Sequence, residues 1–237
     1  LVEVVIAKVG EIALPDGEGD FGAMEQIAQS DVLFRDLEQL IHNHPTQVAS
    51  LMGNHDHAHI GGPVVAKFFD DEAAHTESKL TPQERERLHR FIARFPLIAT
   101  SDCAVAFTHA SSPLSPFDRP MLATLTFDGY DHMPPWSMLN QGFLGELLWR
   151  RGSQLDQTQQ FLQRLATVHP DQPCHIGVYG HEIAREGFDL ENDALLNLST
   201  SFGMRRSHKT YLRLNLNRRY THVDHLRPGH ELLPLYP

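Results

Sequence analysis

The sequence predicts one α+β domain. Segments whose apolar residues recur at helical spacing alternate with short apolar runs typical of buried strands. The last third changes character and alternates apolar with polar residues, as half-buried antiparallel strands do. No internal repeat or linker sequence divides the 237 residues, and a chain of this length buries a real core. We therefore expect residues 1–237 to form a single domain.

The first half of the chain is expected to hold two strands and two helices. Apolar residues at helical spacing predict the first helix, and Asn43–Pro45 ends it. The second helix begins at a Thr-Pro-Gln-Glu motif, which supplies an N-cap, a proline at the first helical position and a glutamate two positions later. These elements are a strand at Val2–Ala7, a helix at Asp31–His44, a buried strand at Gln47–Met52 and a helix from Thr81 to about Arg94.

The second half is expected to continue the alternation and then to end in antiparallel strands. Two apolar runs with β-branched residues predict buried strands, and two longer segments have a helical apolar side. The elements are a strand at Cys103–Thr108, helices at Met138–Arg151 and Leu155–Val168, a strand at Cys174–Tyr179, and half-buried antiparallel strands at Ala194–Thr200 and Tyr211–Asn217.

Composition excludes several classes of protein. The formal net charge is −10, whereas a nucleic-acid-binding protein is usually basic, so we expect no nucleic-acid partner. No apolar run reaches the roughly 18 residues that span a bilayer, and no signal-like segment opens the chain, so a cytoplasmic protein is expected. Cys103 and Cys174 are expected to be buried free thiols. The unusual feature is histidine, with 16 residues.

Three of the apolar runs end in polar clusters that contain histidine. They are VASLM before Gly53-Asn54-His55-Asp56, VAFT before His109, and IGVYG before His181. If these runs are strands of one sheet with the same polarity, an amide oxygen and two imidazoles meet at one edge of that sheet. Such ligands suit a borderline divalent ion such as manganese, iron or zinc, which polarises a phosphoryl oxygen and activates water.

The order of these motifs resembles the calcineurin-like metallophosphoesterases. The resemblance covers roughly residues 31–216 and is greatest to the branch of serine/threonine protein phosphatases and dinucleoside tetraphosphatases. It implies a four-layer α/β/β/α sandwich in which helices flank two mixed sheets. It also implies a metal-dependent hydrolase acting on phosphomonoesters, with a phosphorylated protein or small molecule as substrate and Mn²⁺, or alternatively Fe or Zn, as cofactor.

The resemblance also implies a role for individual residues. Asn54, His109 and His181 match three ligands of the second metal, and His55 matches the general acid that protonates the leaving oxygen. A histidine beside a cation is suited to that step near neutral pH. Arg150 or Arg151 matches an arginine that holds phosphate oxygens, for which a planar fork of donors is useful.

The N-terminal part departs from the family pattern. The family begins with an Asp-x-His motif for the first metal, and none occurs before Asp56. Its next motif, Gly-Asp-x-x-Asp, is best matched by Gly19–Ala23, so Asp20 is the expected bridging ligand and Glu11 a weaker alternative. Ala23 stands where the family has the aspartate that orients the general acid. Either the Asp-x-His strand lies upstream of Leu1 or the first site is degenerate, so two metals are expected only if that site is intact.

Several alternatives stay open at this point. The chain could be a nucleotide or dinucleoside polyphosphate hydrolase, or a pseudophosphatase that binds without catalysis. His55, His57 and His59 alternate along the chain, but we disfavour a three-histidine zinc site because residues after a strand end more often begin a helix or loop. A small cap or rim insertion is expected at about residues 111–140. Its aromatic residues, which either contact substrate or pack the cap, are Phe117, Phe127, Tyr130 and Trp136.

Overall fold

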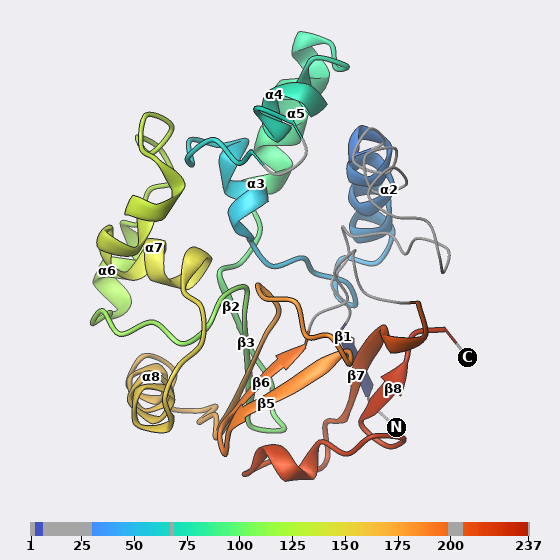
Figure 1. Ribbon diagram of the computed structural model, residues 1–237, viewed down its shortest axis with the longest axis vertical. Helices are drawn as coiled ribbons and strands as arrows, with labels where there is room; N and C mark the ends of the chain where they lie inside the picture. The colour runs from blue at the N-terminus through green and yellow to red at the C-terminus, as the bar shows by residue number, and fades with distance from the viewer. Residues whose placement is uncertain (1–2, 7–29, 67–68, 199–205, 237) are drawn as a thin grey trace.

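A computed structural model describes residues 3–6, 30–66, 69–198 and 206–236 (Figure 1). The described helices are α2 (Ser30–Asn43), α3 (Asn54–Ala58), α4 (Glu72–Glu77), α5 (Pro82–Ile92), α6 (Arg119–Ala123), α7 (Gly142–Trp149) and α8 (Leu155–Val168), with 3-10 turns η1 (Pro135–Asn140), η2 (Arg206–His208) and η3 (Val223–His225). The described strands are β1 (Glu3–Ile6), β2 (Ile98–Thr100), β3 (Val105–Thr108), β4 (Ile176–Tyr179), β5 (Phe188–Asn192), β6 (Leu195–Leu198), β7 (Thr210–Asn215) and β8 (Leu232–Pro234).

One sheet has five strands in the order β2-β3-β4-β6-β5. Its three central strands run parallel, with Val105 opposite Ile176 and Gly177 opposite Leu195, while β2 and β5 pair antiparallel at the two edges. Every residue of β3, β4 and β6 is buried, as expected for strands covered on both faces. The C-terminal ends of β3 and β4 therefore lie side by side at one edge of the sheet.

The other sheet has three strands in the order β1-β7-β8, all antiparallel. Buried residues of both sheets form one hydrophobic cluster, in which Val105 and Phe107 of β3 join Leu212 and Leu214 of β7. Along β7 these buried residues alternate with more exposed ones, which leaves one face of the strand toward the core. The two sheets therefore pack face to face.

Helices cover the outer face of the five-stranded sheet. Ala106 points away from the inter-sheet core and packs with Phe143 of α7 and Phe161 of α8 in a second cluster. A third cluster joins α2, α5 and α7 through Leu37, Ile92 and Leu148, and α3, α4 and α5 lie together beyond the strand ends (Figure 1). The prediction of two sheets flanked by helices is confirmed. Among the described residues, no helix is long and apolar enough to span a membrane.

The strand predicted at Gln47–Met52 is wrong. Residues 48–53 form neither helix nor strand, although Met52 is fully buried and its N–H donates to the Pro96 carbonyl at 3.0 Å. Pro96 has no N–H with which to continue a ladder, so Met52 is buried without becoming part of a sheet, while Ala49 is exposed.

The helix predicted at Met138–Arg151 is confirmed over Gly142–Trp149, but its first residues belong to a separate 3-10 turn. The 3-10 turn η1 ends at Asn140, and α7 begins at Gly142. Gly142 has φ +63°, a left-handed conformation that favours glycine and interrupts the helix at this point.

The remaining predicted elements vary in accuracy. The strand at Val2–Ala7 and the helices at Asp31–His44, Thr81–Arg94 and Leu155–Val168 match β1, α2, α5 and α8 within a few residues. The half-buried antiparallel strand expected from Ala194 is wrong in character: β6 is wholly buried and parallel to β4, although antiparallel to β5. Its last two predicted residues lie outside the described part of the chain. The strands β2, β5 and β8 and the helices α4 and α6 were not expected.

Candidate functional site

His109 and His181 follow the neighbouring parallel strands β3 and β4. The Gly180 N–H donates to the His109 carbonyl at 3.1 Å, which ties the two strand ends together. His109 Nε2 lies 3.0 Å from His181 Nδ1, and the ring centroids are 4.9 Å apart. The convergence expected from strand polarity is therefore present for these two histidines.

Asn54 is brought to the same place by the start of α3. Its Oδ1 lies 2.8 Å from His109 Nε2, and the residue is buried, whereas both histidines are half-buried. The three residues are distant in sequence, since Asn54 precedes His109 by 55 positions and His109 precedes His181 by 72. We call Asn54, His109 and His181 the strand-end trio.

Gly53 allows the close approach of the His109 ring to the start of α3. A Cβ on Gly53 would lie 2.9 Å from two atoms of that ring, closer than real Cβ contacts. The Gly53 N–H also donates to Asp56 Oδ2 at 2.8 Å. The glycine and aspartate of the Gly-Asn-His-Asp motif therefore shape the local backbone around Asn54, which gives Asp56 a structural part.

The strand-end trio offers one amide oxygen and two imidazole nitrogens. This donor set fits a borderline divalent cation, for which imidazole and oxygen ligands are both suitable. Asp20 and the weaker alternative Glu11 lie outside the described residues, as does Ala23. The bridging carboxylate and the first metal site therefore stay predictions.

His55, the residue after Asn54, pairs with Glu72 at the start of α4. His55 Nδ1 lies 2.8 Å from Glu72 Oε2, and 45% of the histidine side chain is exposed, against 12% for the glutamate. Sequence reasoning missed Glu72 because an acidic residue in the first turn of a helix is common for purely local reasons. Only the packing of α4 beside α3 shows that it meets His55.

The two candidate arginines leave the end of α7 in different directions. Arg150 Nη2 donates to Gln157 Oε1 at 3.1 Å, at the start of α8. Arg151 is 71% exposed, and its Nη1 lies 3.8 Å from Glu182 Oε1, on the residue after His181. The backbone holds this segment near the site, since the Ser111 N–H donates to the Arg150 carbonyl at 3.1 Å, two residues after His109.

A buried hydrogen-bond network supports the segment that carries His181. The Tyr179 hydroxyl reaches Glu182 Oε2 at 3.0 Å and also contacts Glu191. Burial and the two carboxylates raise the pKa of Tyr179, so this hydroxyl keeps its proton and serves as a donor. These hydrogen bonds stabilise the turn between β4 and His181.

The alternating histidines after Asn54 separate toward different partners. His57 is buried and its Nε2 lies 2.9 Å from the Phe127 carbonyl, while His59 Nδ1 lies 2.8 Å from Glu77 Oε1. Burial lowers the pKa of His57, only partly offset by the hydrogen bond to Phe127, so this ring is a neutral donor. These three histidines face different partners, which argues against a zinc site built from His55, His57 and His59.

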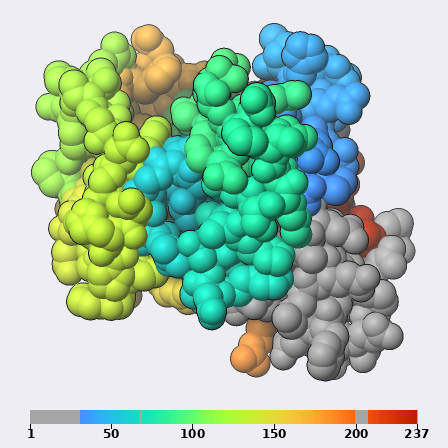
Figure 2. Space-filling model, turned by 90° about the horizontal axis from the view of Figure 1, so that it is seen from above, coloured from blue at the N-terminus to red at the C-terminus, as the bar shows by residue number. Residues whose placement is uncertain are grey.

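The aromatic residues of the 111–140 segment are mostly packed against neighbouring side chains. Phe117 is buried against Phe143, and Phe127 and Tyr130 contact the ring of His57 edge-on. Trp136 differs, because it is 74% exposed. Viewed from above, this segment and the α4–α5 pair lie on either side of α3 (Figure 2). A cap or rim role for the segment stays a prediction.

Two sheets packed face to face, with His109 and His181 after the parallel strands β3 and β4, are consistent with a calcineurin-like phosphatase fold. No protein-family model matches the chain, and no curated protein matches its sequence. Among solved structures, the chain is similar to a protein serine/threonine phosphatase from Saccharomyces cerevisiae, described as similar to human phosphatase PP5. The TM-score is 0.52 at 15% identity, over 81% of this chain and 63% of that one. The chain thus spans less than two thirds of that phosphatase, and the likeness is one of fold.

Proposed function

We propose that the protein is a metal-dependent phosphoesterase that hydrolyses phosphomonoesters, with phosphoserine and phosphothreonine as the first substrates to test. The observation that supports this most strongly is the meeting of Asn54 Oδ1, His109 Nε2 and His181 Nδ1 within 3.0 Å contacts at the ends of β3 and β4. The fold shared with a solved phosphatase supports the reaction class.

The strand-end trio would hold a divalent cation, with Mn²⁺ the first choice and Fe or Zn the alternatives. When bound, the cation supplies Lewis-acid polarisation of a phosphoryl oxygen and lowers the pKa of a coordinated water. The residues themselves contribute fixed positions. The buried Asn54 and the tied strand ends of His109 and His181 keep the donor atoms in place without substrate.

His55 is proposed as the general acid and Glu72 as its positioning residue. In the imidazolium form of His55, Glu72 accepts a hydrogen bond from Nδ1–H, and Nε2–H of the exposed ring gives its proton to the leaving oxygen, which leaves a neutral ring. In this chain Glu72 would thereby perform the orienting role that the resemblance assigns to the position of Ala23. A carboxylate on one ring nitrogen fixes both the tautomer and the ring orientation.

Arg151 is proposed to bind phosphate oxygens, in preference to Arg150. Its guanidinium is exposed and lies beside Glu182, next to His181, whereas Arg150 is engaged with Gln157. We expect R151A to lower kcat/KM roughly tenfold, the size of one charge-assisted hydrogen bond, and R150A to lower it less. Equal effects of the two variants would contradict this choice.

The test combines metal analysis with turnover of p-nitrophenyl phosphate, with and without manganese. We expect metal-dependent turnover by the wild-type chain and its loss in H109A and H181A. The matched control is H132A, since His132 is an exposed histidine paired only with the neighbouring Asp131 in the contacts described. Metal bound without turnover would favour the pseudophosphatase alternative.

A substrate panel separates the remaining alternatives. A phosphoserine peptide and a dinucleoside tetraphosphate are compared at equal enzyme and manganese. Faster cleavage of the dinucleotide would replace the phosphomonoesterase with a polyphosphate hydrolase. Failure of both substrates and of p-nitrophenyl phosphate would reject the proposed enzyme.

A further inference from the structure

A second group of ligand-type side chains lies on the helices α3 to α5. His59 caps the C-terminal end of α3, Glu77 is the last residue of α4, and His89 lies in the last turn of α5. Glu77 Oε1 is 2.8 Å from His59 Nδ1 and 2.8 Å from His89 Nε2. The three ligand atoms lie within 4.8 Å of one another, a spacing at which they could share one cation. We call His59, Glu77 and His89 the helical trio.

The helical trio is largely enclosed. The side chains of His59 and Glu77 are only 5% and 16% exposed, whereas His89 is 37% exposed and opens the group to solvent on one side. The His59 ring packs edge-on against Phe34 of α2, with centroids 5.5 Å apart, which fixes the direction of its ring nitrogens. The donor atoms are therefore held in place before any ion arrives.

The charge of the group favours a cation. Glu77 supplies a carboxylate whose Oε1 faces both imidazoles, an arrangement that attracts a cation when the two rings are neutral. Arg85 takes the other side of this carboxylate, since its Nε lies 3.6 Å from Oε2 and leaves Oε1 to the two histidines. Arg85 is 45% exposed, so solvent screens its charge.

The chemistry of the ligands selects the kind of ion. Calcium and magnesium prefer sets made only of oxygen, which two imidazoles do not provide. Two histidines and one glutamate form a known zinc ligand set, completed by water at the fourth position. For zinc to bind, His59 Nδ1 and His89 Nε2 must offer lone pairs, so each neutral ring carries its proton on its other nitrogen.

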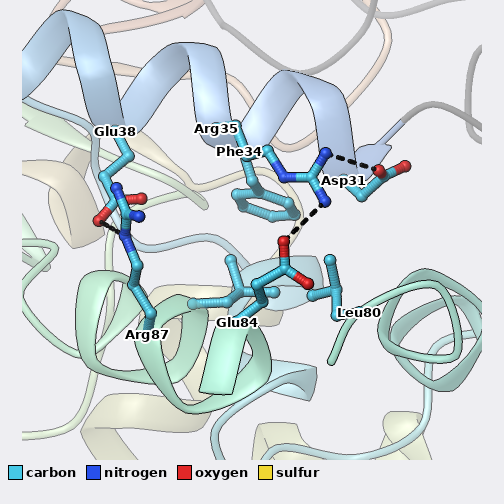
Figure 3. A pocket seen from close by; sticks show the side chains of 8 residues that line it. Asp31, Phe34, Arg35, Glu38, Leu80, Glu84 and Arg87 are labelled. Carbon is cyan, nitrogen blue, oxygen red and sulfur yellow. Dashed lines mark hydrogen bonds and ion pairs between the residues drawn. The ribbon is translucent and has the colours of Figure 1, made fainter. Parts of the chain in front are cut away.

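We propose that His59, Glu77 and His89 form a zinc site that holds α3, α4 and α5 together. It is separate in residues from the strand-end trio and does not rest on the proposed phosphoesterase activity. Helix α5, which carries His89, is already linked to α2 by two ion pairs across a small pocket (Figure 3). Arg35 pairs with Glu84 at 3.2 Å, and Arg87 pairs with Glu38 at 2.8 Å. Zinc would link α3 and α4 to α5, and through α5 to α2.

The experiment measures zinc bound to the full chain after stripping with a chelator and titration with zinc alone. We expect the double variant H109A/H181A, which lacks two strand-end donors, to bind one zinc per chain. Adding E77Q or H89Q to that background should remove this equivalent, while H42Q should not, because His42 is an exposed histidine on α2. Zinc should also raise the Tm of the double variant, and E77Q should abolish the increase.

Cobalt gives a second measurement that reports coordination directly. Co²⁺ bound to the double variant should show the intense visible bands of a tetrahedral site, and H89Q should remove them. Zinc binding that survives both E77Q and H89Q, or a double variant that binds no zinc, overturns the proposal. Should E77Q fail to fold, H89Q decides, since His89 is the most exposed member. Turnover by H89Q with manganese is measured on the same preparation. Loss of zinc binding with turnover retained concerns the helical trio alone and leaves the proposed phosphoesterase standing.

Discussion

The strand-end trio and the helical trio differ in how the chain brings them together. His109 and His181 are 72 positions apart and meet because β3 and β4 pair in parallel, while α3 brings Asn54 to them from 55 positions before His109. Members of the helical trio are only 18 and 12 positions apart and meet through three successive helices. The first site therefore depends on the topology of the sheet, whereas the second depends on local helix packing.

The two trios also differ in charge. The strand-end trio contains no carboxylate, so its side chains leave more of the charge of a bound ion available to polarise substrate. Glu77 supplies a negative charge to the helical trio and partly neutralises its ion. This contrast explains why we assign the first group to chemistry and the second to stability.

The largest expected effect is on turnover, when a variant of the strand-end trio is compared with a variant of the helical trio. H109A should lower p-nitrophenyl phosphate turnover by roughly 10³-fold or more, because it removes a ligand of the cation that stabilises developing charge. H89Q should leave turnover within about twofold of wild type, but the increase in Tm that zinc causes should be smaller. Steady-state kinetics and thermal unfolding on the same preparations measure both. Equal loss of turnover in the two variants would erase the distinction between the trios.

A second prediction concerns His55, which directly follows Asn54 of the strand-end trio in sequence. H55A should slow hydrolysis of phenyl phosphate by about 10²-fold, the usual size of general acid catalysis, and slow p-nitrophenyl phosphate far less. The reason is that p-nitrophenolate leaves without needing a proton. E72Q should show the same selectivity at about tenfold, because Glu72 acts through the His55 ring.

The dependence of the rate on the leaving group shows whether Glu72 orients the His55 ring or only stabilises the packing of α4 against α3. E72D should restore much of the phenyl phosphate rate if the carboxylate orients His55. A loss that is equal for both substrates, or that E72D fails to rescue, would instead mean that Glu72 only holds α4 against α3.

The comparison also explains what the sequence could predict. The convergence of His109 and His181 was predictable because strand polarity alone brings the ends of β3 and β4 together. Helix α8 matches its predicted range because Phe161, Leu162 and Leu165 face one sheet and give a clear helical period. The capping motif likewise located α5, where the Glu84 N–H donates to Thr81 Oγ1 at 3.3 Å.

The partners on the helices could not be predicted in this way. Glu72 and Glu77 lie on a short helix with no apolar period strong enough to predict it, and charged residues are usual on such a surface. Their partners depend on how α3, α4 and α5 pack, which no single pattern encodes. The strand predicted before Asn54 failed for a related reason, because burial of Met52 came from contacts around Pro96 rather than from a ladder.

A third prediction tests how tightly the strand-end trio is built. G53A adds a Cβ that would lie 2.9 Å from the His109 ring, so the ring must move away from Asn54. We expect manganese affinity and turnover to fall roughly tenfold to a hundredfold, as when the supporting shell of a metal site is altered. Zinc at the helical trio should be unchanged, which is checked by comparing the zinc bound by G53A with that bound by G53A/H89Q. Loss of both ions would show that Gly53 supports the whole helical layer.

The smallest expected effect concerns the thiols, which belong to neither trio. Burial raises the pKa of Cys174 to about 11 and raises that of Cys103 above its usual value, so few thiolates exist at pH 8. Iodoacetamide should therefore react slowly with the native chain, faster as the pH rises toward 11, and fully in urea. Cys103 and Cys174 pack in the two clusters on either face of the five-stranded sheet. Stripping zinc should loosen α3 to α5 without speeding alkylation, and rapid labelling after stripping would mean that the helical trio supports the entire fold.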